Sequence, residues 1–352
     1  MPRQPGHDER ILTIMTSRER IQAIIAGRPA DRHGFWLGNP HPDSLPALHG
    51  YFGTSTLEEL HVLLGSDFRW ITPQYMEATY RHPEGQGIFD VWKRKKSLGE
   101  AGPLAQAESL GDVESYTWPD PEYLDFDECL HVLQEAGPFY RASGFWMPFF
   151  HDVMDLFGVE EFMVKLHTRP DLIHAAFGRV CGFYLEANAR FFSLAGDQVD
   201  AFFFGNDFGT QRDLLIAPAQ FDEFVLPWVG RFAAQAREFR LQVILHSCGS
   251  IHRIIGRLID AGIECLHPLQ ARASGMDAVS LAGSFGNRIA FLGGVDTQDL
   301  LVHGTPEAIA AEIRRLKGVF GPRWIVSPSH EALLPDVPPA NVGAMAEAAR
   351  RP

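Results

Sequence analysis

Short apolar runs alternate regularly with amphipathic segments after residue 200, and this alternation restricts the possible folds more than any other sequence feature. The run 201–205 (AFFFG) is apolar throughout, as expected for a strand covered on both faces. In the segment 218–240 the apolar residues instead recur at helical spacing. The predicted strands are 201–205, 241–246, 263–268, 288–292 and 324–326, and the predicted helices between them are 218–240, 251–261, 276–285 and 307–317. Repeated strand–helix units of this kind predict a parallel sheet.

Three earlier apolar runs, at 35–37, 68–72 and 145–149, bring the predicted strands to eight. Eight such units favour a closed (β/α)8 TIM barrel of the α/β class, a fold that occupies ~250 residues or more. An open doubly wound sheet is the alternative, and it is disfavoured because no strand is followed by a Gly-x-Gly-x-x-Gly turn. We therefore expect one barrel domain over residues 16–352.

Two additions to this barrel are expected. A helix begins near Ser17, which is a suitable N-cap, and forms an N-terminal helical extension behind a flexible tail of residues 1–15. Between Tyr75 and Lys96, aromatic and charged residues alternate around a Pro-Glu-Gly turn. This pattern predicts a β-hairpin excursion near the barrel mouth.

The composition excludes several classes of protein. Apolar residues make up 45% of the chain and charged residues 21%, which allows a large core and argues against disorder. The net charge of −13 repels a phosphate backbone, so we expect no nucleic acid partner. The four cysteines are far apart, and we find no signal peptide and no apolar run approaching ~20 residues. We expect a cytoplasmic protein with reduced thiols and no contact with a membrane.

Catalytic groups of an α/β barrel lie where its strands end and the following loops begin. The polar residues at or near the predicted strand ends are Asp67, His151, Asp152, Asn206, Asp207, Gln211, His246, Cys248, Gln270, Asp296, Gln298 and His330. We expect the active site to be built from members of this set.

The most specific of these candidates is His246-Ser247-Cys248, after the fifth predicted strand. Two residues apart on an extended segment, the imidazole and the thiol project to the same side. They are suited to zinc, which needs a third protein ligand and an open position for catalysis. The eighth strand lies near enough in a closed barrel to supply His330 as that ligand. The alternative is that Cys248 is a small buried residue and His246 a hydrogen-bonded core histidine.

The other candidates leave more than one interpretation open. The adjacent His151 and Asp152 form either an acid/base pair or part of a pocket wall. Asn206 and Asp207 indicate ligand contacts, because a buried loop carboxylate needs a partner, here the metal or the substrate. Asp67 is either functional or the cap of a loop.

Several motifs then follow one another in a fixed order. They are 206–211 (NDFGTQ) with Pro218, 246–250 (HSCGS), Gly262, Gln270, 275–277 (GMD), 285–286 (FG), 291–296 (FLGGVD) and 327–330 (SPSH) with Pro338 and Asn341. In this series the chain resembles the uroporphyrinogen decarboxylase (URO-D) superfamily over nearly its full length. The fold of that superfamily is the barrel expected above.

This resemblance implies one of two chemistries. True uroporphyrinogen decarboxylases need no metal, and they hold an acidic tetrapyrrole with an arginine-rich N-terminal segment and an aspartate. Here Asp67 would occupy the aspartate position and His330 matches a histidine of the decarboxylases. The segment 34–40 (GFWLGNP) lacks the arginines, which counts against this chemistry in a chain of net charge −13.

The other branch comprises zinc-dependent methyltransferases. They move a methyl group between a corrinoid protein and a thiol such as coenzyme M, or from a methylated substrate to the corrinoid. Their His-x-Cys motif is matched by His246 and Cys248, but their cysteine after strand eight is replaced by His330, with Glu331 beside it. A zinc site with fewer thiolates is a harder Lewis acid, which leaves room for oxygen substrates.

We favour the methyltransferase branch, with zinc on His246, Cys248 and His330 and a corrinoid supplied by a partner protein. The expected catalytic residues are Asp207, His330 and Asp67, and the expected substrate-binding residues are His151, Asn206, Gln211, Gln270 and Asp296. The alternatives are a metal-independent decarboxylase, using Asp67 and His330, and a non-catalytic module that binds a ligand or corrinoid. We also expect a small-molecule substrate and a homodimer.

Overall fold

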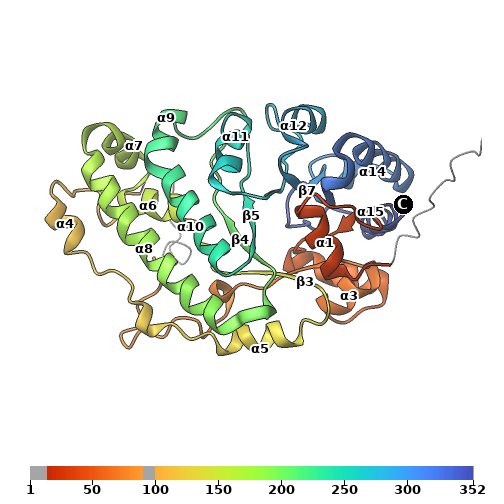
Figure 1. The fold of residues 1–352 in the computed structure, drawn as a ribbon, viewed down its shortest axis with the longest axis horizontal. Helices are drawn as coiled ribbons and strands as arrows, with labels where there is room; N and C mark the ends of the chain where they lie inside the picture. Colours follow the sequence, from red (N-terminus) through yellow and green to blue (C-terminus); the bar gives the residue numbers. More distant parts are fainter. Residues whose placement is uncertain (1–13, 90–99, 352) are drawn as a thin grey trace, which may run out of the picture.

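Eight parallel strands form the centre of the molecule in the computed structural model, which describes residues 14–89 and 100–351. The strands are β1 Gly34–Phe35, β2 Phe68–Trp70, β3 Tyr140–Ser143, β4 Ala201–Gly205, β5 Gln242–His246, β6 Cys265–His267, β7 Ala290–Val295 and β8 Trp324–Pro328. Their order in the sheet is β1-β8-β7-β6-β5-β4-β3-β2, so the sheet runs almost completely around a barrel (Figure 1). The predicted (β/α)8 barrel is confirmed.

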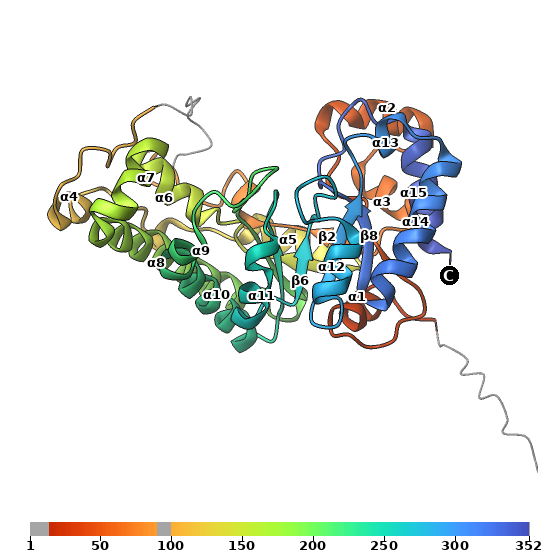
Figure 2. The ribbon, with the colours of Figure 1, turned by 90° about the horizontal axis from the view of Figure 1, so that it is seen from above.

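Helices surround this barrel and extend it along its longest axis. They are α1 Ser17–Ile25, α2 Leu45–Phe52, α3 Leu57–Leu64, α4 Leu110–Glu114, α5 Asp127–Glu135, α6 Phe149–Phe157, α7 Val159–Thr168, α8 Pro170–Ala195, α9 Pro218–Gln220, α10 Leu226–Glu238, α11 His252–Ala261, α12 Ala278–Phe285, α13 Leu300–His303, α14 Pro306–Phe320 and α15 Pro339–Arg350. Figure 2 shows α4 and α7 at one end of the molecule and α14 and α15 at the other. Within the described residues, no helix combines the length and the apolar character that crossing a bilayer requires.

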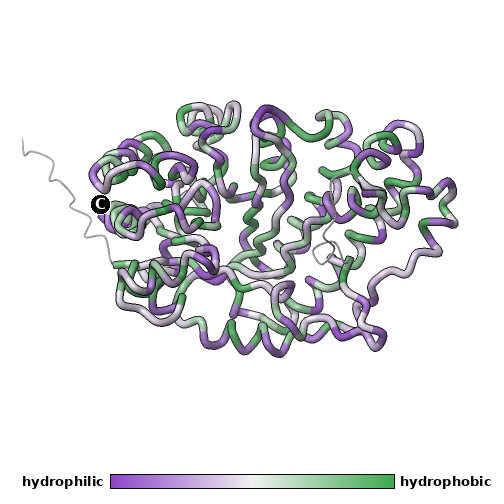
Figure 3. Tube along the Cα trace, turned by 180° about the vertical axis from the view of Figure 1, so that it is seen from behind, coloured by the Kyte–Doolittle hydropathy of each residue, from purple (hydrophilic) through white to green (hydrophobic). Residues whose placement is uncertain are grey.

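Two apolar layers explain why the strands are so uniformly hydrophobic. In β4, Phe203 packs inside the barrel with Trp36 and Ile244, whereas Phe202 and Phe204 pack outward against the helices. Since both faces are buried, an alternating polar pattern is not needed. Hydrophobic and hydrophilic residues alternate along the outer helices instead (Figure 3), as expected for helices with one face in the core.

Asp67 links β1 and β2 across the last gap in the barrel, through its backbone and its side chain. Asp67, which precedes β2, donates its amide to the carbonyl of Phe35 at 2.7 Å and accepts the amide of Phe35 at 3.0 Å through its carboxylate. The carboxylate also forms ion pairs with Arg20 at 2.7 Å and with Arg32 at 2.8 Å. These contacts lie at the N-terminal ends of the strands, where α1 is also packed.

The third strand differs from the predicted one. Residues 145–149 form the loop after β3 and the first residue of α6, because Gly144 and Met147 have positive φ angles of 100° and 41° and turn the chain. This loop is apolar because it is buried, and its amide at Phe145 is bound by the side chain of Asn188. The predicted start of the first helix was also one residue late, since Thr16 and not Ser17 is the N-cap.

The predicted β-hairpin between residues 75 and 96 is wrong for its described part. Residues 75–89 contain no strand, and Tyr80 forms a single antiparallel bridge with the distant Leu124. The aromatic residues of this segment pack on other elements instead; for example, Tyr80 contacts Phe183 of α8. Residues 90–96 of the predicted hairpin and residues 1–13 of the predicted tail lie outside the described residues.

Candidate metal centre

Polar side chains from β5, β6 and the loops after β4, β5 and β8 meet at the C-terminal end of the barrel. His246 is the last residue of β5, and its register partners are Gly205 in β4 and His267 in β6. This pairing places His267 beside His246, and the loops after β4 and β8 bring Asp207 and Glu331 to the same point.

One group of donor atoms surrounds Nε2 of His246. This nitrogen lies 3.4 Å from Sγ of Cys248 and 3.3 Å from Oδ1 of Asp207. Around a tetrahedral zinc ion, bond lengths of about 2.0–2.3 Å separate neighbouring ligand atoms by about 3.4–3.6 Å. The two distances from Nε2 are therefore close to those that zinc requires, all three atoms lie within 4.8 Å of one another, and their nitrogen, sulfur and oxygen chemistry suits zinc.

The backbone fixes this group by locking two loops together. The amide of Cys248 donates to Oδ1 of Asp207 at 2.8 Å, and the amide of Ser250 donates to the carbonyl of Thr210 at 2.7 Å. Gly249 has a φ of +86°, and a Cβ on it would stand 2.2 Å from the carbonyl oxygen of Gly209. Only glycine allows the two loops to approach this closely.

A second group surrounds Nδ1 of the same histidine. This nitrogen lies 3.0 Å from Nδ1 of His267 and 3.5 Å from Oε2 of Glu331. Within the described part of the chain, Nε2 of His267 and Oε2 of Glu331 are buried and form no hydrogen bond. Trp146 covers the ring of His246, with 4.9 Å between ring centroids.

The site stabilises positive charge at His246. Burial alone would lower the pKa of His246, but the charges of Glu331 and Cys248 and the hydrogen bond with Asp207 raise it well above the ordinary value. Burial favours neutral Asp207, yet the hydrogen bond and charge of His246 hold the pKa of this carboxyl far below its usual range. Burial, with the neighbouring His246, lowers the pKa of His267 strongly, so His267 stays neutral. A site whose negative groups stabilise positive charge in this way is suited to bind a cation.

His330 lies beside this cluster but outside both groups of donor atoms found among the described residues. Its Nδ1 accepts the amide of Ala332 at 3.1 Å, so a neutral ring carries its proton on Nε2. The ring is within hydrogen-bonding reach of the Cys248 thiol, and that contact is the main reason why the pKa of His330 is raised. In this arrangement the Ala332 amide already uses the lone pair on Nδ1 of His330.

The remaining predicted residues have other partners. Both ends of the buried Asn206 amide are used, since Oδ1 accepts from Phe150 in the first turn of α6 at 2.9 Å and Nδ2 donates to Met147 in the loop before α6 at 3.1 Å. Asn206 thereby positions α6, whose His151 is close enough to Asp207 to feel its charge.

Gln270 and Gln211 are brought together on the rim. Oε1 of Gln270 accepts from the amide of Gly249 at 2.7 Å and from the side chain of Gln211 at 3.4 Å. Asp296 caps the turn before α13 and forms an ion pair with Arg272 at 3.4 Å. Asp67 is at the opposite end of the barrel, so the structure does not bring it together with the other predicted site residues.

Two members of the cluster were not among the predicted site residues. His267 reads in the sequence as the polar end of an apolar strand, and only its register with His246 reveals it. Glu331 was noted only as the neighbour of His330. A rule that pairs the last residues of adjacent barrel strands would have found His267.

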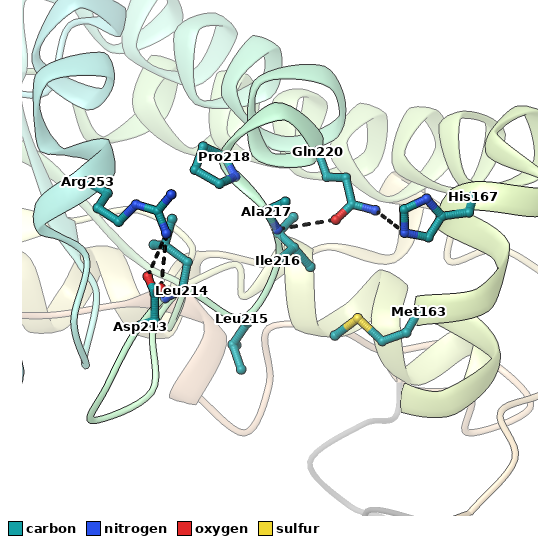
Figure 4. A pocket seen from close by; sticks show the side chains of 10 residues that line it. All are labelled: Met163, His167, Asp213, Leu214, Leu215, Ile216, Ala217, Pro218, Gln220 and Arg253. Atoms are coloured by element: carbon teal, nitrogen blue, oxygen red, sulfur yellow. Dashed lines mark hydrogen bonds and ion pairs between the residues drawn. The ribbon is translucent and has the colours of Figure 1, made fainter.

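A separate cavity of about 350 Å³ lies on the same loop as Asp207, farther along the chain (Figure 4). Residues 214–218 line it together with Met163, and its polar side chains already form pairs. Arg253 binds Asp213 at 3.0 Å, and Gln220 lies 2.9 Å from His167. None of its lining residues belongs to the candidate metal centre.

Comparison with known proteins places these features in a family. The fold is similar to that of a methyltransferase from Methanosarcina mazei, with a TM-score of 0.69, 18% sequence identity, and coverage of 95% of this chain and 98% of that chain. No curated protein matches the sequence. The family model for uroporphyrinogen decarboxylase (URO-D) matches residues 150–352, more than half of the chain, and this segment contains every residue of the two donor groups. The chain therefore belongs to the uroporphyrinogen decarboxylase (URO-D) family.

Proposed function

We propose that this protein is a zinc-dependent methyltransferase or demethylase, which moves a methyl group between a small substrate or thiol and a corrinoid carried by a partner protein. The observation that carries the proposal is the spacing of His246 Nε2, Cys248 Sγ and Asp207 Oδ1, at 3.4 and 3.3 Å around the imidazole nitrogen. The similarity in fold to a methyltransferase supports it.

The proposed ligands are His246, Cys248 and Asp207, in place of the set with His330 that the motif alone suggests. His330 then donates a hydrogen bond to the sulfur of Cys248. A hydrogen bond to a thiolate withdraws charge from it, so His330 would weaken the electron donation of the only proposed sulfur ligand. Three protein ligands leave one tetrahedral position for the substrate.

The rest of the site binds and shields the substrate. When bound, zinc would supply a Lewis acid that lowers the pKa of a substrate thiol or polarises an ether oxygen. Trp146 packs edge-on against the ring of His246, which is buried. Gln211 and Gln270 lie on the rim and provide amide groups that can orient a polar substrate. His151 of α6 is close enough to Asp207 to feel the charge of its carboxylate.

The geometry gives little support to the metal-independent decarboxylase. In that hypothesis Asp67 stabilises the substrate, but its carboxylate is occupied by Arg20 and Arg32 and lies at the opposite end of the barrel from His330. A decarboxylase would therefore have to use another acid.

The metal content of purified variants tests this proposal. We expect about one equivalent of zinc in the unaltered protein, no zinc after His246→Ala or Cys248→Ala, and retained zinc after His330→Ala. Asp296→Asn is the matched control, because this carboxylate lies on the same rim but is bound to Arg272. Methyl transfer is then followed by the absorbance change of cob(I)alamin on methylation.

Two results would overturn the proposal. One is a zinc content below about a tenth of an equivalent that Cys248→Ala does not change. The other is retention of zinc in Asp207→Ala with its loss in His330→Ala, which would return His330 to the ligand set.

A further inference from the structure

The imidazole of His246 is contacted at both of its nitrogens. Nε2 faces Cys248 and Asp207, whereas Nδ1 faces His267 at 3.0 Å and Glu331 at 3.5 Å. A neutral imidazole has one N–H and one lone pair, so the groups around Nδ1 decide which nitrogen can bind a metal.

His267 is fixed in the centre of the barrel. Its ring is 0% exposed and packs against Trp36 and Phe203, with centroid distances of 5.2 and 5.3 Å. A buried ring nitrogen without a partner lowers stability. Nε2 of His267 has no hydrogen bond among the described residues, whereas Nδ1 points at His246. The polar ring therefore costs stability in a core that is otherwise aromatic.

Glu331 is held in place through its backbone. Its carbonyl oxygen accepts the amide of Asn39 at 2.8 Å, and a Cβ on Gly38 would stand 2.4 Å from the same oxygen. Its buried Oε2 lies 3.5 Å from Nδ1 of His246 and 3.7 Å from Nδ1 of His330. The loop after β1 thus fixes a carboxylate beside His246.

We propose that His267 and Glu331 are positioning residues that keep the proton of His246 on Nδ1 and so direct the lone pair of Nε2 at the metal. His267 accepts this proton through its own Nδ1, and the carboxylate of Glu331 stabilises the positive end of the N–H bond. The remaining proton of His267 is then on Nε2, the nitrogen without a partner. The inference rests on the zinc site proposed above, because it concerns the orientation of a zinc ligand.

Three substitutions separate this role from simple packing. His267→Phe keeps an aromatic ring between Trp36 and Phe203 but removes both nitrogens. His267→Asn keeps an acceptor near the position of Nδ1, and Glu331→Gln keeps the shape of the side chain without its charge. Asp296→Asn again serves as the control carboxylate.

Zinc affinity, measured by competition with a chromophoric chelator, is the first readout. Loss of a group that orients a metal-bound histidine typically weakens binding by about 10- to 100-fold, and we expect this for His267→Phe and Glu331→Gln. His267→Asn should restore affinity to within a few-fold of the unaltered protein. The visible spectrum of the Co²⁺-loaded protein should shift in the first two variants and not in Asp296→Asn.

Thermal unfolding of the metal-free protein is the second readout. His267→Phe should unfold at the same or a higher temperature, because it removes a buried nitrogen without a partner. A folded variant with weaker zinc binding supports positioning, whereas a destabilised variant with unchanged zinc affinity overturns it.

The outcomes also distinguish this inference from the proposed function. If Cys248→Ala abolishes zinc binding while His267→Phe and Glu331→Gln do not weaken it, the zinc site stands and the positioning role is wrong. If the unaltered protein binds no zinc, the proposed function itself fails. Two zinc equivalents, one of them lost in Glu331→Gln, would make Glu331 a ligand of a second ion and contradict the positioning role.

Discussion

Asp67 and Asp207 are both carboxylates next to barrel strands, but they stand at opposite ends of those strands. Asp67 precedes β2 and is surrounded by the guanidinium groups of Arg20 and Arg32. Asp207 follows β4 and lies near an imidazole and a thiol. In a parallel barrel this difference separates a structural carboxylate from one at the catalytic end.

Asp67→Asn is expected to lower stability without affecting metal binding. Arg20 keeps its ion pair with Asp31 at 2.7 Å and Arg32 is partly exposed, so the expected cost is that of buried hydrogen-bonding groups left without a partner, about 1–3 kcal/mol. The free energy of unfolding, measured by urea denaturation, should fall by about this amount, with zinc content unchanged. A stable Asp67→Asn protein without activity would return Asp67 to a catalytic role.

The sequence was sufficient to predict that the side chains of His246 and Cys248 lie together, because residues two apart on an extended segment project to the same side. It was not sufficient for His267, which lies 21 residues away and meets His246 only through the register of β5 and β6. It also could not show that the Ala332 amide occupies Nδ1 of His330, because that depends on the local turn.

At the scale of elements, the two loops after β4 and β5 behave as one unit. Their backbones touch at Gly209 and Gly249, and the amide of Ser250 binds the carbonyl of Thr210. The same contact sets the distance between Asp207 and Cys248, so the loops determine the size of the proposed metal site.

Gly249→Ala is expected to separate these loops. A Cβ would stand 2.2 Å from the Gly209 carbonyl at a φ of +86°, and both the clash and the backbone angle are unfavourable. Zinc affinity should fall by at least about tenfold, because a displaced ligand loses its geometry. Gly230→Ala in α10 is the control, since its Cβ would meet no atom within 4 Å. Unchanged affinity in Gly249→Ala would show that the loops move independently of the site.

The third strand shows why elements can be misplaced when the fold is right. Residues 145–149 are as apolar as a buried strand, but they are buried as a loop between the barrel and α8. The true strand, Tyr140–Ser143, contains Arg141 and Ser143 and is weaker in pattern. Burial was predicted well, and the conformation that achieves it was not.

At the scale of the molecule, the repeated strand–helix pattern carried most of the information about the fold. Every strand predicted after residue 200 overlaps an observed one, from β4 to β8. The near-closure of the barrel between β1 and β2 depends on the backbone amide and carboxylate of Asp67 and on the Ser66 hydroxyl, and no periodic pattern records such contacts.

The acid sensitivity of the whole molecule should depend on His61 of α3. Burial and the charge of Arg69 lower its pKa to about 3, so the folded protein keeps this ring neutral while the unfolded chain takes up a proton below about pH 6.5. The contribution of the neutral His61 ring to the free energy of unfolding is therefore fully present above pH 6.5 and is lost as the pH falls toward 3. At pH 5 the loss amounts to about 2 kcal/mol.

Urea denaturation at pH 7 and pH 5 measures this contribution. In His61→Leu the difference in unfolding free energy between the two pH values should shrink by about 2 kcal/mol. His131→Leu is the control, because the side chain of His131 is 68% exposed. An unchanged difference in His61→Leu would assign the acid sensitivity to other groups.

X-ray absorption at the zinc edge of the purified protein tests the central claim most directly, because it counts the ligands of the metal by element. The account predicts a single sulfur at about 2.3 Å, from Cys248, with the remaining ligands nitrogen or oxygen at about 2.0–2.2 Å and the sulfur signal absent in Cys248→Ser. A zinc site without sulfur, or with two or more sulfurs, would contradict it.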